Sequence, residues 1–152
     1  MSRMFTVRQA TIEDLNPLAD VFNLYRVFYK QDSNLEGAKL FLSERLKLEE
    51  SIIYIAVDNG TDAIIAFTQL YPTFSSISMR RAWTLNDLYV AEHYRGQGIA
   101  QLLLDQAKLL AKETKSKGLS LSTAVDNEVA QKLYERNGFI KDEEFYHYDL
   151  QV

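Results

Sequence analysis

The chain has 152 residues, and its content of 47% apolar and 25% charged residues is that of an ordinary globular protein, which excludes disordered and fibrous classes. The absence of cysteine excludes disulfides, thiolate metal ligands and a cysteine nucleophile. A net charge of −4 argues against a nucleic-acid partner, because such partners are bound largely through phosphate neutralisation.

The length predicts a single domain over residues 1–152. No apolar run approaches the roughly 18 residues of a membrane helix, so we expect no membrane partner. The start Met1–Phe5 leads directly into a strand-like segment, which predicts no signal peptide and a cytosolic, that is cytoplasmic, location.

The first part of the chain predicts one strand, two helices and three further strands. Thr11 with Asp14, and Ser33 with Glu36, have the spacing of capping boxes that begin helices. Asp58-Asn59-Gly60 has the composition of a hairpin turn. The expected elements are a strand at 4–10, helices at about 11–29 and 33–50, strands at 51–57 and 63–72, a polar connection at 73–78 and a strand that ends at 90.

The second part predicts a helix from Ile99 that ends in lysines, with Gly118 as its stop. Further expected elements are a strand at 119–125, a helix from Asp126 or Asn127 to Arg136, and one or two strands within 139–150. The resulting order is mixed α/β, with too many consecutive strands for a doubly wound Rossmann sheet.

The segment Arg95-Gly96-Gln97-Gly98-Ile99-Ala100 lies between a predicted strand and a predicted helix. A glycine-rich turn in that position directs backbone N–H groups at a phosphate. The Walker A pattern is absent. The dinucleotide fingerprint fits poorly, because the glycines follow several strands and position 101 is Gln.

Arg95, Gly98 and Ala100 match the pattern Arg/Gln-x-x-Gly-x-Gly/Ala. With the order of elements, this makes the chain resemble the GNAT superfamily of acetyl-CoA-dependent N-acyltransferases from about residue 5 to residue 149. The resemblance implies a mixed α/β fold with a central, mostly antiparallel twisted sheet and about four flanking helices. It also implies acetyl transfer from acetyl-CoA to a primary amine by direct attack in a ternary complex, without a metal.

The resemblance extends over Leu85–Val90 into the loop, and over Asn127, Ala130, Tyr134 and Gly138-Phe139. It implies that Tyr134 is the catalytic general acid, and that Leu88 and Val90 bind pantetheine strand-fashion through their backbones. The cofactor-binding residues implied are Leu88, Tyr89, Val90, Arg95, Gly96, Gln97, Gly98, Ile99, Ala100 and Asn127.

Within the superfamily, Phe67–Pro72 and Leu85–Val90 look most like the polyamine and histone acetyltransferase branch. Asn86 stands where spermidine/spermine acetyltransferases have an acidic residue, and Asp87 retains the next acid. Asn86 and Asp87 are therefore the candidate acceptor-binding residues. The plainer interpretation of this pair is a strand bulge or a surface-facing pair.

Several alternatives stay open. The acceptor could be a small or polyamine-like amine, a protein lysine or a protein N-terminus, and a non-catalytic acyl-CoA-binding regulatory module is the alternative of another class. The resemblance also implies a homodimer. His93 and His147 are isolated without metal-ligand spacing, which favours surface positions.

Overall fold

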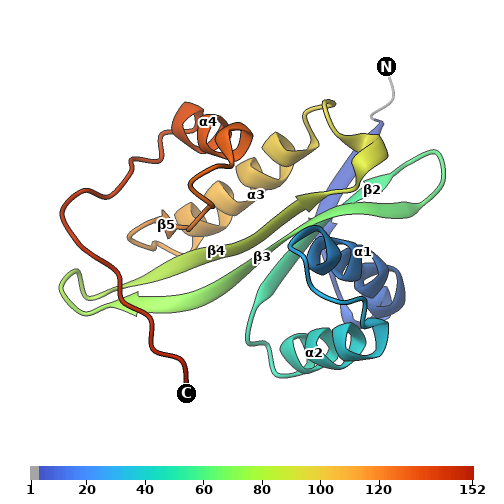
Figure 1. Cartoon of the computed structure of the whole chain (residues 1–152), viewed down its shortest axis with the longest axis horizontal. Coiled ribbons are helices and arrows are strands. Elements are labelled where there is room, and N and C mark those ends of the chain that lie inside the picture. Colours follow the sequence, from blue (N-terminus) through green and yellow to red (C-terminus); the bar gives the residue numbers. More distant parts are fainter. Residues whose placement is uncertain (1–3) are drawn as a thin grey trace. The chain divides into compact units, whose positions relative to one another are not determined.

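The computed structural model describes residues 4–152, which divide into two compact units, one through Leu121 and one from Ser122. Met1 to Arg3, on which the prediction of no signal peptide partly rests, lie outside the described residues. The first unit holds a five-stranded sheet in the order β1-β2-β3-β4-β5 (Figure 1). Its strands are β1 Phe5–Gln9, β2 Ile52–Asp58, β3 Ala63–Ser75, β4 Arg80–Val90 and β5 Leu119–Ser120.

Helices cover both faces of this sheet: α1 Leu15–Phe28 and α2 Leu35–Lys47 on one, and α3 Ile99–Glu113 on the other (Figure 1). Successive side chains of a strand point to opposite faces. Along β2, Ile53 and Ile55 are buried in a core shared with residues of α1 and α2. Tyr54, between them, hydrogen-bonds with Gln106 of α3. The sheet therefore has two separately packed faces, in agreement with the predicted fold class.

Strands β1 to β4 are antiparallel neighbours, whereas β5 runs parallel to β4. Gln69 of β3 pairs with Asp87, and the next residue, Leu70, pairs with Leu85. Asn86 is thus an extra residue in β4, which makes a β-bulge at this point. The bulge that the sequence offered as one interpretation of Asn86-Asp87 is confirmed.

The predicted helix starts are partly correct. Asp14 accepts a hydrogen bond from the Thr11 N–H at 2.8 Å, as a capping box requires, and a 3₁₀ turn at Ile12–Asp14 precedes α1. The predicted cap at Ser33 is wrong. The cap of α2 is Asn34, whose Oδ1 accepts from the Gly37 N–H at 2.9 Å, while the Ser33 hydroxyl accepts a bond from Asn23.

The predicted end of α3 at Gly118 is also wrong. The helix ends at Glu113, and the left-handed residue after it is Lys115, with φ of 53°. The hydroxyl of Thr114 donates to the Leu110 carbonyl at 2.7 Å, and the Ser116 N–H donates to the Ala111 carbonyl at 3.0 Å. These bonds satisfy the last carbonyl groups, so the helix ends before a glycine is reached.

The second unit contains α4, Glu128–Arg136, which Asn127 caps as predicted: its Oδ1 accepts from the Ala130 N–H at 3.1 Å. The predicted strand at 119–125 shortens to β5, and the predicted strands within 139–150 are absent from the described residues. There Asp142 instead accepts local bonds from the Glu144 and Phe145 N–H groups. Such turns compete with a strand ladder, and an apolar alternation alone provides no partner strand.

Candidate active site

The two edges of β4 differ. Strand β3 pairs along one edge, whereas β5 pairs on the other only at Trp83 and Thr84 in the part of the chain that the structure describes. We call the second edge of residues 85–90 the open edge of β4. The Ala91 N–H donates to the Ile65 carbonyl of β3 at 2.9 Å. Because N–H groups alternate along a strand, those of Leu88 and Val90 point to the open edge.

Beyond β4 and a 3₁₀ turn at Glu92–Tyr94, the chain forms the glycine loop and enters α3. Gly96 and Gly98 have left-handed φ values of 78° and 79°. A Cβ atom at either glycine would meet nothing within 4 Å, so the backbone conformation, not crowding, requires glycine there. Ile99 is buried and anchors the first turn of α3. The N–H groups of that turn have no partner within their own helix and suit an anion.

Arg95 lies against the open edge of β4. Its Nε donates to the Val90 carbonyl at 2.9 Å. Its guanidinium carbon lies 5.2 Å from the centre of the Phe28 ring and 5.4 Å from that of Tyr89. Arg95 therefore joins the glycine loop to α1 and β4 by cation–π contacts and one hydrogen bond, while its side chain stays exposed to solvent.

Asp87, directly after the bulge, is only 5% exposed, although it is a charged residue. Gln69 Nε2 donates to its Oδ2 at 2.7 Å, and Asn86 Nδ2 donates to its Oδ1 at 3.1 Å. The Tyr25 hydroxyl of α1 is a third donor. Burial raises the pKa of Asp87 above its ordinary value, and the three donors oppose that rise without cancelling it.

Aromatic rings cluster around Tyr25, the donor to this carboxylate from α1. The ring of Tyr25 lies 5.5 Å from that of Phe67 and 5.9 Å from that of Tyr89. Burial and the nearby Asp87 raise the pKa of Tyr25, and the same causes raise the pKa of Tyr71 to about 12. Both phenols therefore keep their protons at neutral pH. Aromatic faces beside a single carboxylate form an environment suited to an ammonium group.

Sequence reasoning missed two members of this site, Gln69 and Ser51. Gln69 is fully buried, and its Oε1 accepts from the Ser51 hydroxyl at 2.8 Å. The available signal was a pair of polar residues, Thr68 and Gln69, within an apolar strand pattern. Nothing in the pattern showed which strand Gln69 would face.

In the second unit, the predicted site residues lie on one helix. Asn127 caps α4, and Tyr134, half-buried near its end, makes an edge contact with Phe139 at 5.6 Å between ring centres. Asn127, Ala130 and Tyr134 follow the i, i+3, i+7 spacing of one helix face, as predicted. Gly138 has the left-handed φ of 91° expected after the helix.

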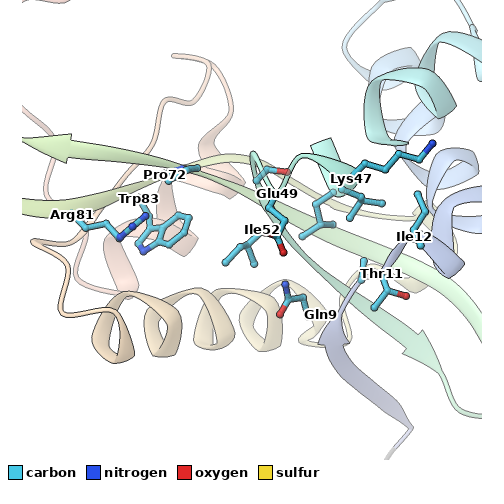
Figure 2. Close-up of a pocket in the computed structure, with 13 residues that line it drawn as sticks. Gln9, Thr11, Ile12, Lys47, Glu49, Ile52, Pro72, Arg81 and Trp83 are labelled. Carbon is cyan, nitrogen blue, oxygen red and sulfur yellow. The ribbon is translucent and has the colours of Figure 1, made fainter. Parts of the chain in front are cut away.

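A groove of about 500 Å³ opens elsewhere in the first unit, beside the ends of β1 and α2 (Figure 2). Its lining includes Gln9, Lys47, Trp83 and Arg81, and none of the predicted cofactor or acceptor residues. Ser51, which also lines it, connects it to the Asp87 network through Gln69.

Residues 4–152 contain no group of three or more His, Asp or Glu side chains that could hold a metal ion. None of the described helices is long and apolar enough to cross a membrane. His93 is exposed in the turn before the loop, and His147 contacts Asp142 at 3.2 Å on the surface of the second unit.

The sequence profile of the acetyltransferase (GNAT) family matches residues 18–139, which include the whole Asp87 network and the glycine loop. The chain belongs to this family. The uncharacterized N-acetyltransferase YhfO of Bacillus subtilis is 49% identical over 146 residues, which are 96% of this chain and 97% of that protein. A crystal structure of a probable acetyltransferase is 48% identical, covers 97% of both chains and has a TM-score of 0.92.

Membership makes this GNAT protein an acyltransferase of a family that uses acetyl-CoA. A structure of a predicted acetyltransferase with acetyl-CoA from Clostridium acetobutylicum shares the fold, with a TM-score of 0.77 at 20% identity over 96% of both chains. The likeness to the polyamine and histone branch is not confirmed and stays a prediction.

Proposed function

We propose that this GNAT protein transfers the acetyl group of acetyl-CoA to a primary amine of a small or polyamine-like molecule, by direct attack in a ternary complex. The observation that carries the proposal is the bulge at Asn86. On its C-terminal side, β4 offers the N–H groups of Leu88 and Val90 along an open edge and the side chain of Asp87 to the buried aromatic cluster around Tyr25, which we call the Asp87 pocket. One strand thus serves an acyl donor and an amine at once.

On the donor side, the open edge of β4 would bind the pantetheine arm as an added strand would bind. The loop Arg95–Ala100 and the first turn of α3 would hold the pyrophosphate through N–H groups, with Arg95 adding a positive charge. Two N–H groups along the edge, followed by an anion site at the loop, fit an extended polar ligand that carries a phosphate group farther along.

On the acceptor side, Asp87 would bind the ammonium group of the amine. A primary amine has a pKa of about 10 and must lose a proton before it attacks. A carboxyl group is a weak base for that proton, so binding the ammonium and passing its proton to water is the better role. The neutral nitrogen then bonds to the acetyl carbon, the carbon–sulfur bond breaks, and the sulfur leaves as a thiolate that is protonated to the thiol.

Tyr134 would be the hydrogen-bond donor to the leaving thiolate. A thiolate of pKa about 8.5 takes a proton from a phenol of pKa about 10 at a cost near 2 kcal/mol. A donor that strengthens as the sulfur gains charge is therefore a better description than a full acid. The support for this role is the position of Tyr134 in the family motif, seven residues after the cap Asn127.

Acetyl-CoA binding by calorimetry, followed by mass spectrometry of products from spermidine, free amino acids and a peptide library, tests the proposal. We expect binding and acetylation of a small amine. No binding at near-millimolar acetyl-CoA would refute it. Acetylated peptides alone would establish a protein acetyltransferase, and binding without any product a regulatory module.

Tyr134→Phe tests the donor role. The variant removes the hydroxyl that would donate to the leaving thiolate, so we expect kcat to fall at least about tenfold. Because the rest of the ring stays in place, the affinity for acetyl-CoA should change little. Tyr146→Phe, at an exposed position of the same unit, is the matched control and should turn over like the wild type. An unchanged kcat in Tyr134→Phe would remove this residue from the mechanism.

A homodimer, which the family resemblance implies, and the cytosolic location expected from the sequence remain part of the proposal. Light scattering of the purified protein at several concentrations tests the first.

A further inference from the structure

The buried side chain of Gln69 makes two hydrogen bonds at a position where the fold alone needs only an apolar side chain. It is fully buried in β3, and both ends of its amide are bonded: Nε2 to Asp87 at 2.7 Å and Oε1 to Ser51 at 2.8 Å. Burying an amide is costly unless its hydrogen bonds are made. An apolar side chain at this position would spare the sheet that requirement, so the chain Ser51–Gln69–Asp87 calls for a functional reason.

The donor-to-acceptor direction of the hydrogen bonds that join Ser51, Gln69 and Asp87 follows from the negative charge of Asp87. An ionised carboxylate can only accept hydrogen bonds, so Gln69 must turn its NH₂ group toward Asp87. The amide oxygen is then left to Ser51, whose hydroxyl has to donate. Asp87 thus sets the orientation of the Gln69 amide, because the reversed amide would place two oxygens against each other, and Ser51 bonds to the amide oxygen and holds the side chain in place.

The same contacts use three acceptor positions of the Asp87 carboxylate. A carboxylate has about four acceptor positions. Gln69, Asn86 and Tyr25 occupy one each. With two oxygens held by donors from β3, β4 and α1, the carboxyl plane is fixed, and one position remains for the acceptor amine.

We propose that Gln69, held by Ser51, is a positioning residue that fixes the Asp87 carboxylate so that its remaining acceptor position faces the amine. The inference rests on the proposed function of Asp87. A second consequence follows from the donor at Oδ2, since a hydrogen bond to the ionised form favours that form. Gln69 therefore lets Asp87 stay ionised to a lower pH than burial would otherwise allow.

Other groups around Asp87 bear on this pH dependence. Tyr25 of α1, Tyr29 directly after α1 and Tyr71 of β3 are phenols, and Arg45 of α2 is a further charge that acts on Tyr71. The phenols Tyr25 and Tyr71 have raised pKa values, so they do not titrate with Asp87. The acid limb of the rate profile therefore reports on Asp87.

Gln69→Leu and Thr68→Val form a matched pair. Thr68 is equally buried, but its hydroxyl donates to the main-chain carbonyl of Asp87 at 2.7 Å and not to the carboxylate. We expect Gln69→Leu to lower kcat about tenfold, to move the acid limb of kcat/KM to higher pH and to leave acetyl-CoA affinity unchanged. Thr68→Val should lose thermal stability without moving the acid limb.

Ser51→Ala is the milder variant and decides the question if Gln69→Leu fails to fold. We expect a smaller shift of the acid limb in the same direction. A carbon-13 NMR titration of the Asp87 carboxyl, without substrates, should give the highest pKa in Gln69→Leu, an intermediate pKa in Ser51→Ala and the lowest pKa in the wild type.

The outcomes separate the two proposals. Full activity in Asp87→Asn would refute the proposed role of Asp87 itself. An inactive Asp87→Asn, together with a wild-type titration and acid limb in Gln69→Leu and Ser51→Ala, would overturn the positioning role and leave the proposed function standing.

Discussion

The Asp87 pocket and the glycine loop are neighbours along one strand and its continuation, yet they are built in opposite ways. The pocket is buried, and its side chains are held by hydrogen bonds from three elements. The loop Arg95–Gly98 is exposed, and its shape comes from two left-handed glycines. The difference teaches that side-chain chemistry and pH should govern the pocket, whereas backbone conformation should govern the loop.

The largest expected effect is in the pocket. Asp87→Asn keeps the shape of the side chain but removes the charge that binds the ammonium, so kcat/KM for the amine should fall about 100-fold or more. Acetyl-CoA affinity, measured by calorimetry, should stay within about twofold of the wild type. An equal loss of both would break the distinction between pocket and loop.

The loop should show the reverse behaviour. Gly98→Ala forces a Cβ onto a left-handed residue, which costs about 1–2 kcal/mol, so we expect roughly tenfold weaker acetyl-CoA binding with an unmoved pH profile. Gly118→Ala is the control, because Gly118 has no left-handed φ and open space around its Cα. Calorimetry with thermal unfolding separates loss of binding from loss of fold. Equal affinities for the two variants would contradict a backbone-built phosphate site.

The smallest effect concerns stability and has opposite signs at two carboxylates. The raised pKa of Asp87 means that the folded state holds its proton more tightly than the unfolded state. Ionisation of Asp87 therefore lowers stability as pH rises above the unfolded pKa, so the Tm of Asp87→Asn relative to that of the wild type should be higher at pH 7 than at pH 4.

Asp14 behaves in the opposite way. The Arg8 guanidinium, 2.8 Å away, lowers its pKa, so its ionised form stabilises the fold above the unfolded pKa and the gain is lost as pH falls through the folded pKa. Asp14→Asn should lose about 1 kcal/mol at pH 7, as lost caps do, or about 2–4 °C in Tm. Scanning calorimetry at pH 4 and pH 7 measures both variants. A Tm of Asp87→Asn, relative to the wild type, that is no higher at pH 7 than at pH 4 would show that the charge of Asp87 does not destabilise the fold.

The sequence was most informative where function depends on a continuous segment. Gly96 and Gly98 are needed for their own backbone conformations, so the loop was visible in a few consecutive residues. The bond from Gln69 to Asp87 depends on the register of β3 against β4, and the bulge at Asn86 shifts that register by one residue. A pairing of this kind cannot be obtained from either strand alone.

The wrong predictions have two origins, one local and one long-range. Gly118 was expected to end α3, but hydroxyl groups of Thr114 and Ser116 bond to its last carbonyls earlier in the chain. The alternation within 139–150 predicted strands from side chains only, whereas a strand also needs a partner backbone. Short-range patterns specify where a strand can form, and long-range pairing decides whether it does.

The open edge of β4 also has a consequence for solubility. A row of unpaired N–H and C=O groups on an edge is a template on which another chain can add a strand and aggregate. Here Arg95 covers the Val90 carbonyl with its Nε, and the bulge at Asn86 interrupts the row. A charged side chain and a bulge are both known protections of such edges. The residues that prepare this edge for a ligand thus also disfavour the addition of a further strand at this edge.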